Sequence, residues 1–373
     1  MNLSITEVKN SRDLRKFIKF PLKLYKSSKQ YVPDLYVDQK ESLTKSPSLD
    51  YCKLKMWLAM DGKMVVGRIA GIINPNYNEV YGTKRARFNW VDFVERYEVA
   101  ELLFRTAEQW AKSEGMTEIH GPLSYNTWGK QGMLVEGFEN IPPINCIYNY
   151  PYYKEFTERY GFEKEIDWVQ YELPATQQPS EKLFRINDML LNRYPLKIVD
   201  LKEAKKKGGL IERFFQNYNE TFKSVFNFVP LTDKEIEKLG RSYIRTLKPE
   251  LVCLVMDDQE RIASFGICLP SFSKAFQKAK GRLFPFGWYH IIKAYFKYDV
   301  IDLMMVGADP HWKSKGVSAI FHVKLAENFL NRGVKSAIAN PIIETNLARK
   351  VWDTYEERED YMRRRSYIKR VGD

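Results

Sequence analysis

The sequence contains little histidine and cysteine, and it has no long hydrophobic run. Its 373 residues include four histidines and four cysteines, and no two cysteines form a C-x-x-C pair. A metal site is therefore not expected. No stretch of about 20 apolar residues occurs, and the opening residues MNLSITEVKNSRDLRKF lack the apolar core of a signal peptide. We expect a cytoplasmic protein with no membrane span and no metal.

Catalytic patterns for hydrolysis are also missing, because no G-x-S-x-G motif accompanies a Ser-His-Asp set. What the chain does have is a formal net charge of +12. Such a charge can attract phosphate-bearing cofactors, nucleic acid or an anionic membrane face. The densest basic cluster lies at Arg363–Arg370. It is either a solvated strand edge or an anion-contacting surface.

The two halves of the chain repeat one order of elements. Each half has an opening strand, helical material, a β-hairpin, a strand, a helix, a strand, and a closing helix and strand. The first hairpin turns at Asp61-Gly62 and the second at Asp257–Glu260. A linker-like segment, Pro174–Ser180 (PATQQPS), separates the halves. We predict an α/β protein of two tandem domains, 1–175 and 176–373, each a mixed twisted sheet with helices on both faces.

The most informative stretch is Leu303–Ile320, LMMVGADPHWKSKGVSAI. An apolar strand ends near Ala308, a short basic loop follows, and a helix begins at about Val317. The first N–H groups of a helix are unpaired and carry partial positive charge, so they suit a pyrophosphate. Gly316 allows the backbone to approach closely.

This stretch resembles the acyl-CoA loop of the GCN5-related N-acetyltransferase (GNAT) family, whose pattern is Gln/Arg-x-x-Gly-x-Gly/Ala. Lys313 replaces the Gln or Arg, Gly316 holds the first glycine position, and Ser318 replaces the last small residue. The resemblance implies an acyl-CoA co-substrate, acetyl-CoA or another, in the second domain. The residues expected to bind it are Met305, Val306, Gly307, Ala308, Lys313, Ser314, Lys315, Gly316, Val317, Ser318 and Asn346.

The same resemblance suggests catalytic residues. In GNAT proteins an amine attacks the thioester directly, a base takes the amine proton, and a tyrosine often protonates the departing thiolate. The usual tyrosine position falls on Asp353, so nearby Tyr355 is our candidate. Glu344 and Glu136 are candidate bases, and Glu344 is the one we assign. Asn346 either faces the cofactor or, with Thr345, caps a helix.

The first half matches the fold but not the phosphate loop. The spacing from Asn149 to Gly161-Phe162 resembles the GNAT pattern Asn-x11-Gly-Phe. The corresponding loop, DFVERYEVAEL, has no glycine and carries four acids, which would repel a pyrophosphate, so no CoA is expected there. Instead the segment 121–149, with its neighbours, resembles the YghO-like tandem-GNAT proteins of bacteria. It is either a structural loop or an acceptor site formed by Asn126, Glu136, Tyr148 and Asn149.

The function expected from these resemblances is an acyl-CoA-dependent N-acyltransferase acting on a small amine or peptide, with no DNA partner. Two alternatives remain. One is a tRNA-dependent aminoacyl transferase of the FemABX type, for which the net charge and Arg363–Arg370 would suit an RNA. The other is a non-catalytic GNAT-fold binding protein. The basic, aromatic segment Ser271–Lys297 covers the acceptor, contacts a membrane surface or packs between domains.

Overall fold

The computed structural model describes residues 2–176, 178–243, 247–346 and 358–372, and these form two compact units. Unit 1 contains Met1–Val169, Phe272–Tyr295 and Met362–Asp373. Unit 2 contains Gln170–Ser271 and Phe296–Tyr361. The sequence led us to expect two consecutive halves. The units differ from that division because two later segments, 272–295 and 362–373, belong to unit 1.

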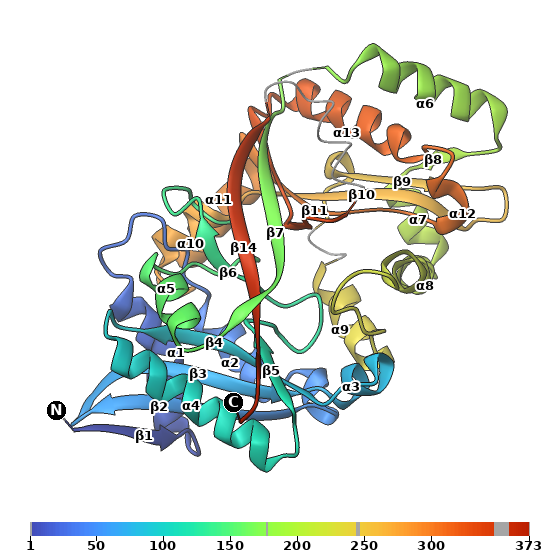
Figure 1. Ribbon diagram of the computed structural model, residues 1–373. Coiled ribbons are helices and arrows are strands. Elements are labelled where there is room, and N and C mark those ends of the chain that lie inside the picture. Colours follow the sequence, from blue (N-terminus) through green and yellow to red (C-terminus); the bar gives the residue numbers. More distant parts are fainter. Residues whose placement is uncertain (1, 177, 244–246, 347–357, 373) are drawn as a thin grey trace. The chain divides into compact units, whose positions relative to one another are not determined.

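Unit 1 is a mixed sheet with helices on both faces (Figure 1). Its strands follow the order β1-β2-β3-β4-β5-β14; β4 and β5 run parallel, and the other neighbours in this order, as the structure describes them, run antiparallel. The elements are β1 (Leu3–Glu7), α1 (Ser11–Leu24), α2 (Tyr36–Thr44), η1 (Pro47–Asp50), β2 (Lys53–Asp61), β3 (Met64–Ile73), α3 (Pro75–Tyr81), β4 (Arg85–Phe93), α4 (Tyr97–Ser113), β5 (Glu118–Gly121), β6 (Met133–Glu136), α5 (Tyr152–Arg159), α10 (Ser273–Ala279), and parts of β7 (Glu163–Pro174), α11 (Gly287–Phe296) and β14 (Glu359–Arg370).

The alternation of side chains along β2 explains why both faces are covered. Trp57 packs into the core beneath α4, whereas its neighbour Leu58 packs into a separate core with α1. On β3, a Cβ at Gly67 would lie 2.7 Å from Leu103, and one at Gly71 would meet the ring of Trp110. Helix α4 therefore approaches the sheet closely because those positions carry no side chain.

Unit 2 repeats the arrangement with strand order β7-β12-β11-β10-β9-β8, in which β11 and β12 run parallel. Helix α13 packs on one face against Gly266, and α7 and α8 pack on the other against Phe265. The elements are α6 (Glu181–Arg193), β8 (Lys197–Val199), α7 (Leu201–Lys207), α8 (Leu210–Phe222), α9 (Asp233–Tyr243), η2 (Pro249–Leu251), β9 (Val252–Met256), β10 (Ile262–Pro270), β11 (Val300–Ala308), α12 (Pro310–Lys313), α13 (Ser318–Arg332), β12 (Ser336–Ala339) and β13 (Ile342–Ile343). The α/β class and the mixed sheets predicted from the sequence are confirmed.

The closing strands correct one sequence expectation. We expected each half to end with its own last strand. Instead β14, at the end of the chain, pairs with β5 of unit 1 (Tyr367 opposite Gly121), and the end of β7 pairs with β12 of unit 2 (Pro174 opposite Ser336). Hydrophobic alternation is the same for either partner, so the sequence pattern does not distinguish the two pairings.

Ion pairs fix β14 in unit 1. Arg365 donates to the buried carboxylate of Asp167 from Nε at 2.8 Å and from Nη2 at 3.1 Å, and Lys369 donates to Glu108 at 2.9 Å. Burial acts to raise the pKa of Asp167, but the hydrogen bonds and charge of Arg365 outweigh it and hold that pKa below its usual range. The Arg363–Arg370 cluster is therefore largely compensated within unit 1.

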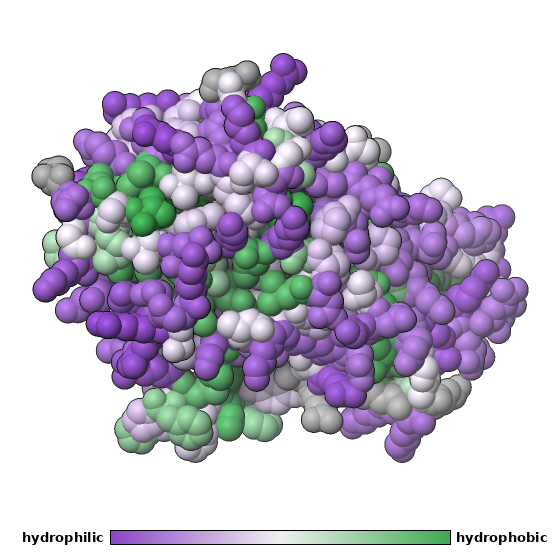
Figure 2. All heavy atoms as spheres, turned by 90° about the horizontal axis from the view of Figure 1, so that it is seen from below, coloured by the Kyte–Doolittle hydropathy of each residue, from purple (hydrophilic) through white to green (hydrophobic). Residues whose placement is uncertain are grey.

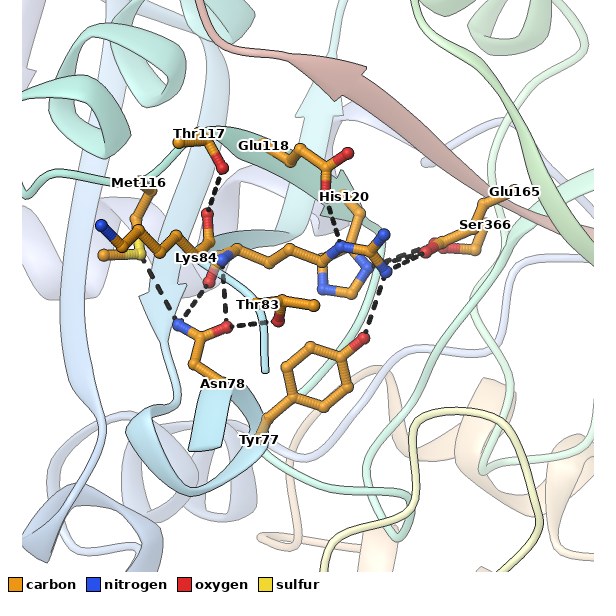
Figure 3. A network of polar contacts seen from close by, with 11 residues as sticks. Tyr77, Asn78, Thr83, Lys84, Met116, Thr117, Glu118, His120, Glu165 and Ser366 are labelled. Carbon is orange, nitrogen blue, oxygen red and sulfur yellow. Dashed lines mark hydrogen bonds and ion pairs between the residues drawn. The ribbon is translucent and has the colours of Figure 1, made fainter. Parts of the chain in front are cut away.

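A second polar network joins β4, β5, β7 and β14 (Figure 3). Arg85 bridges Glu118 and Glu165, with Nε 2.6 Å from the first carboxylate and Nη1 3.2 Å from the second. Ser366 of β14 also donates to Glu165, at 2.9 Å. Burial lowers the pKa of His120, and its Nδ1–H donates to the Glu165 carboxylate at 3.1 Å. The network gives β14 a polar as well as an apolar attachment to unit 1.

Candidate functional site

A split between two parallel strands defines the candidate site in unit 2. Strands β11 and β12 pair only over Val300–Leu303 and Ser336–Ala339, yet β11 continues to Ala308. On the other side of β11, the register with β10 shifts, so that Met304 is an extra, bulged residue between Leu303 and Met305. In the described part of the chain, no β12 residue pairs with Met304–Ala308. This edge presents backbone groups that an extended ligand can pair with.

The segment after β11 forms the short helix α12 and then a turn at Ser314–Val317 that leads into α13. Gly316 has φ of +79°, a left-handed conformation that favours glycine, and the N–H groups of Ala319 and Ile320 bond to Gly316 and Val317. Within the described residues, no backbone carbonyl accepts from the N–H groups of Val317 and Ser318, and no side chain caps this end of the helix. A 15-residue helix whose first amides are uncapped favours an anion at that end.

The two lysines of the loop differ. Lys315 donates to His311 at 3.0 Å, and its ammonium lies 4.2 Å from the centre of the Trp312 ring. Lys313 is exposed. The charge of Lys315 is thus held against an aromatic ring near the loop, while the side chain of Lys313 stays in solvent.

An apolar pocket adjoins the split. Its volume is about 40 Å³, space for about three methylene-sized groups. One polar side chain lines it, His322, whose pKa burial lowers to about 4, so the ring is neutral at neutral pH. The pocket is lined by Leu173, Pro174, Ala175, Leu303, Val306, Phe321, His322, Leu325, Ala326, Phe329 and Ala337. Because Leu303 and Val306 belong to β11, a short hydrocarbon group could enter from the split.

Asp302 is a residue that the sequence reasoning missed. It lies on β11 beside Leu303, is 3% exposed, and burial raises its pKa to about 7. Its Oδ1 is buried without a hydrogen-bond partner among the described residues. Side chains alternate along a strand, so Asp302 lies on the opposite face from the Leu303 side of the pocket. The signal that could have found it was a lone carboxylate inside the apolar run VIDLMMVGA.

The structure places the residues predicted to bind acyl-CoA as follows. Met305–Ala308 and Lys313–Ser318 form one continuous strand–loop–helix segment in unit 2. Gly307 has a packing reason of its own, because a Cβ there would lie 2.6 Å from Phe265. Asn346 follows a turn after β13, where its N–H bonds to Ile343, and Glu344 lies half-buried in that turn. Tyr355 lies outside the described residues.

The predicted acceptor residues all belong to unit 1, and the side chains of two of them make hydrogen bonds or ion pairs with neighbouring residues. The Asn149 side chain is buried and bonds to both backbone groups of Leu134, at 2.7 and 2.9 Å. Glu136 accepts from Arg363 at 3.1 Å. Asn126 accepts from the Trp128 N–H in a turn, and Tyr148 is buried within an aromatic cluster. These contacts give Asn149 a structural role and leave an acceptor role for the others as a proposal.

The loop of unit 1 also differs from its sequence interpretation. Asp92, one of the four acids expected to repel a pyrophosphate, is buried and accepts from Arg68 and Tyr25, each at 2.7 Å. Its charge is therefore compensated. Any repulsion at the amino end of α4 comes from the remaining acids, such as Glu98 in the first turn. No cluster of His, Cys, Asp and Glu suited to a metal occurs in the residues the structure describes.

The chain is similar in sequence to known proteins. No family model matches the sequence. Protein YghO of Escherichia coli K12 is 26% identical over 370 residues, covering 97% of this chain and 94% of YghO. A protein named bacterial ceramide synthase, from Caulobacter vibrioides, is 26% identical over 293 residues, covering 77% of this chain and 75% of that protein.

Solved structures share the fold. A tandem GNAT protein from the clavulanic acid biosynthesis pathway aligns with a TM-score of 0.58 and 12% identity, covering 100% of this chain and 99% of that one. A GCN5-related N-acetyltransferase from Sphaerobacter thermophilus aligns with a TM-score of 0.54 and 10% identity, covering 98% and 96%.

Proposed function

The chain is a tandem GNAT-fold protein that resembles YghO along its length, and we propose that it transfers an acyl group from acyl-CoA to an amine, using a site in unit 2. The observation that carries the proposal is the uncapped amino end of α13 at the end of the unpaired β11 edge. The first feature suits a pyrophosphate and the second suits an extended pantetheine arm.

Each part of the site has a role in the proposal. The N–H groups of Val317 and Ser318 hold the pyrophosphate, and Lys313 adds positive charge. The Met304–Ala308 edge pairs with the pantetheine arm and directs the thioester into the split. The bulge at Met304 turns backbone N–H groups out of the regular ladder, so one of them can donate to the thioester oxygen. The apolar pocket takes the acyl tail.

The chemical step needs a base for the amine proton. The amine nitrogen bonds to the thioester carbon, the C–S bond breaks, and the nitrogen loses one proton. We assign that proton to Asp302, which lies on β11 one residue before the last pair with β12, where the split begins, and whose pKa burial raises to about 7. Glu344 remains the alternative base, and Tyr355 is the sequence-based candidate for protonating the thiolate.

For the acceptor we place a long-chain amine ahead of a peptide. One relative is named a bacterial ceramide synthase. A ceramide is the amide of a long-chain amino alcohol and a fatty acid, so its synthesis acylates an amine. The small pocket would then have to open around a longer acyl chain, and a series of acyl-CoA substrates from C2 to C16 measures this directly.

The aminoacyl-tRNA alternative is less favoured by the structure. It drew on the Arg363–Arg370 cluster, and within unit 1 Arg365 and Lys369 are paired with Asp167 and Glu108. The cluster therefore offers an RNA less free charge than the sequence suggested. The cytoplasm, where acyl-CoA is available, is the location we propose.

The test is CoA binding by a pair of glycine variants. Gly316 and Gly333 lie just before and just after α13, with φ of +79° and +70°. Glu at either position bears a similar backbone strain, but only Gly316→Glu puts a carboxylate at the pyrophosphate site. Calorimetry should show CoA binding at least about tenfold weaker for Gly316→Glu and nearly unchanged for Gly333→Glu. Equal affinities in the two variants would contradict the assigned site.

A further inference from the structure

The segment Arg282–Lys297 of the chain exposes an unusual number of hydrophobic side chains; we refer to it as the aromatic-basic segment. It consists of a loop and helix α11. Phe284 is 77% exposed and Phe286 is 69% exposed. On the face drawn in Figure 2, hydrophilic side chains predominate and hydrophobic ones gather in a few patches. Half of the exposed large hydrophobic side chains in the described residues lie in this segment: Phe284, Phe286, Trp288, Tyr289, Ile292 and Phe296.

The exposed face of helix α11 is largely apolar, because it carries Trp288, Tyr289, Ile292 and Phe296 beside Lys293, and an apolar helix face is usually buried. Here only Gly287 of the helix is buried. A single exposed apolar residue needs no explanation, but six large ones between Phe284 and Phe296 are typical of a binding surface. The described residues contain no helix of the length and apolar character needed to cross a bilayer. The exposed apolar side chains therefore suit contact with the face of a bilayer rather than a path across it.

The charged residues of the segment itself all have the same sign. Between Ser271 and Tyr298 the sequence contains no Asp or Glu. The basic residues of that stretch are Lys274, Lys278, Lys280, Arg282, Lys293 and Lys297. Helix α1 of the same unit brings Lys19 near Arg282: burial, Arg15 and the charge of Arg282 all lower the pKa of Lys19. Aromatic and aliphatic side chains among lysines and arginines match the interface of an anionic membrane.

The base of the segment is fixed to unit 1. The Tyr36 N–H donates to the Gly281 carbonyl at 2.9 Å, and Gln277 donates to the Lys29 carbonyl at 2.8 Å. Ser273 donates to the carbonyl of Pro142 at 2.8 Å. These bonds hold α10, so the exposed tip projects from an anchored support rather than from a free loop.

We propose that the aromatic-basic segment is a membrane-docking surface that binds the headgroup region of an anionic bilayer. The side chains of Phe284, Phe286 and Ile292 enter the interface, while Arg282 and Lys293 meet lipid phosphates. The proposal does not depend on acyl transfer. If the acceptor is a long-chain amine, docking also brings unit 1 to the surface in which such an amine dissolves.

Flotation with lipid vesicles tests the proposal. The full chain should bind vesicles of phosphatidylcholine containing about 30% phosphatidylglycerol at least about tenfold more tightly than vesicles of phosphatidylcholine alone, and about 0.5 M NaCl should weaken the binding. The variant Phe284→Ser/Phe286→Ser/Ile292→Ser should lose this binding. Its matched control, Val37→Ser/Met64→Ser/Val80→Ser, removes three other exposed side chains of unit 1 and should bind like the unaltered chain.

Further measurements distinguish docking from misfolding, from loss of the CoA site and from self-association. Equal melting temperatures for the two triple variants show that folding is unchanged, and retained CoA binding by the first shows that loss of docking is not loss of the CoA site. Vesicle-induced blue shift of fluorescence should disappear in Trp288→Phe. The proposal is overturned if the unaltered chain ignores anionic vesicles or if both triple variants bind equally. It is also overturned if the unaltered chain forms a dimer that the first variant abolishes while neither binds lipid.

Discussion

Replacement of Asp302 by Asn should make the protein more stable and less active at the same time. The native state holds the Asp302 proton up to a pKa of about 7, whereas an unfolded Asp loses it near pH 4. The native state therefore binds more protons between these values, and the stability contributed by this group falls as the pH rises through them. The difference of about three pKa units corresponds to about 4 kcal/mol above pH 7. Asn is neutral at every pH and avoids this cost.

Two assays on Asp302→Asn check the reasoning. Urea unfolding should show that the advantage of the variant over the unaltered chain grows by about 2.5 kcal/mol from pH 5 to pH 8. Steady-state acyl transfer should show kcat lowered by about 10²-fold or more with KM for acyl-CoA little changed. Glu344→Gln serves as the control for the alternative base. A variant that is destabilised at pH 8 and retains full kcat would refute both the burial argument and the assignment of the base.

Two further predictions concern other buried ionisable side chains. His322 is neutral in the native state with a pKa of about 4, so the stability that it contributes is full above pH 6.5 and falls as the pH drops. In urea unfolding, lowering the pH from 7 to 5 should therefore raise the stability of His322→Leu relative to the unaltered chain by about 2 kcal/mol. A difference that does not change with pH would contradict a buried, neutral ring. Asp167→Asn leaves Arg365 without its buried carboxylate and should lower the free energy of unfolding by about 3 kcal/mol. The control Glu181→Gln breaks the exposed pair with Arg185 and should lower it by about 0.5 kcal/mol or less. Similar losses in the two variants would contradict the role of Asp167 in attaching β14.

Local patterns predicted much of the fold. The Asp61-Gly62 turn, the two amphipathic helices that end shortly before Gly115 and Gly333, and the glycine loop at Gly316 all depend on neighbouring residues, and each occurs where the sequence indicated. The strand–loop–helix order that suggests an acyl-CoA site is local in the same way. For these elements the sequence is sufficient because turn and cap geometry depends on a few adjacent residues.

Long-range pairings were harder to predict. The sequence could not show that Tyr367 pairs opposite Gly121 or that Pro174 pairs opposite Ser336, because strand partners share one alternating pattern. Asp92 looked like a free carboxylate until its contact with Arg68, 24 residues away, was visible. Asp302 was overlooked for a different reason: its raised pKa results from burial, and the sequence alone does not show that this carboxyl is buried.

The response of backbone amide resonances to CoA is the decisive measurement for the site at α13. In a ¹⁵N-labelled chain, the N–H groups of Gly316, Val317 and Ser318 should shift on addition of CoA, because the pyrophosphate accepts hydrogen bonds from this turn. The amide resonances of Tyr97 and Glu98, at the corresponding end of α4 in unit 1, should keep their chemical shifts. CoA binding that shifts the α4 amides and leaves Gly316–Ser318 unchanged would contradict a pyrophosphate site in unit 2.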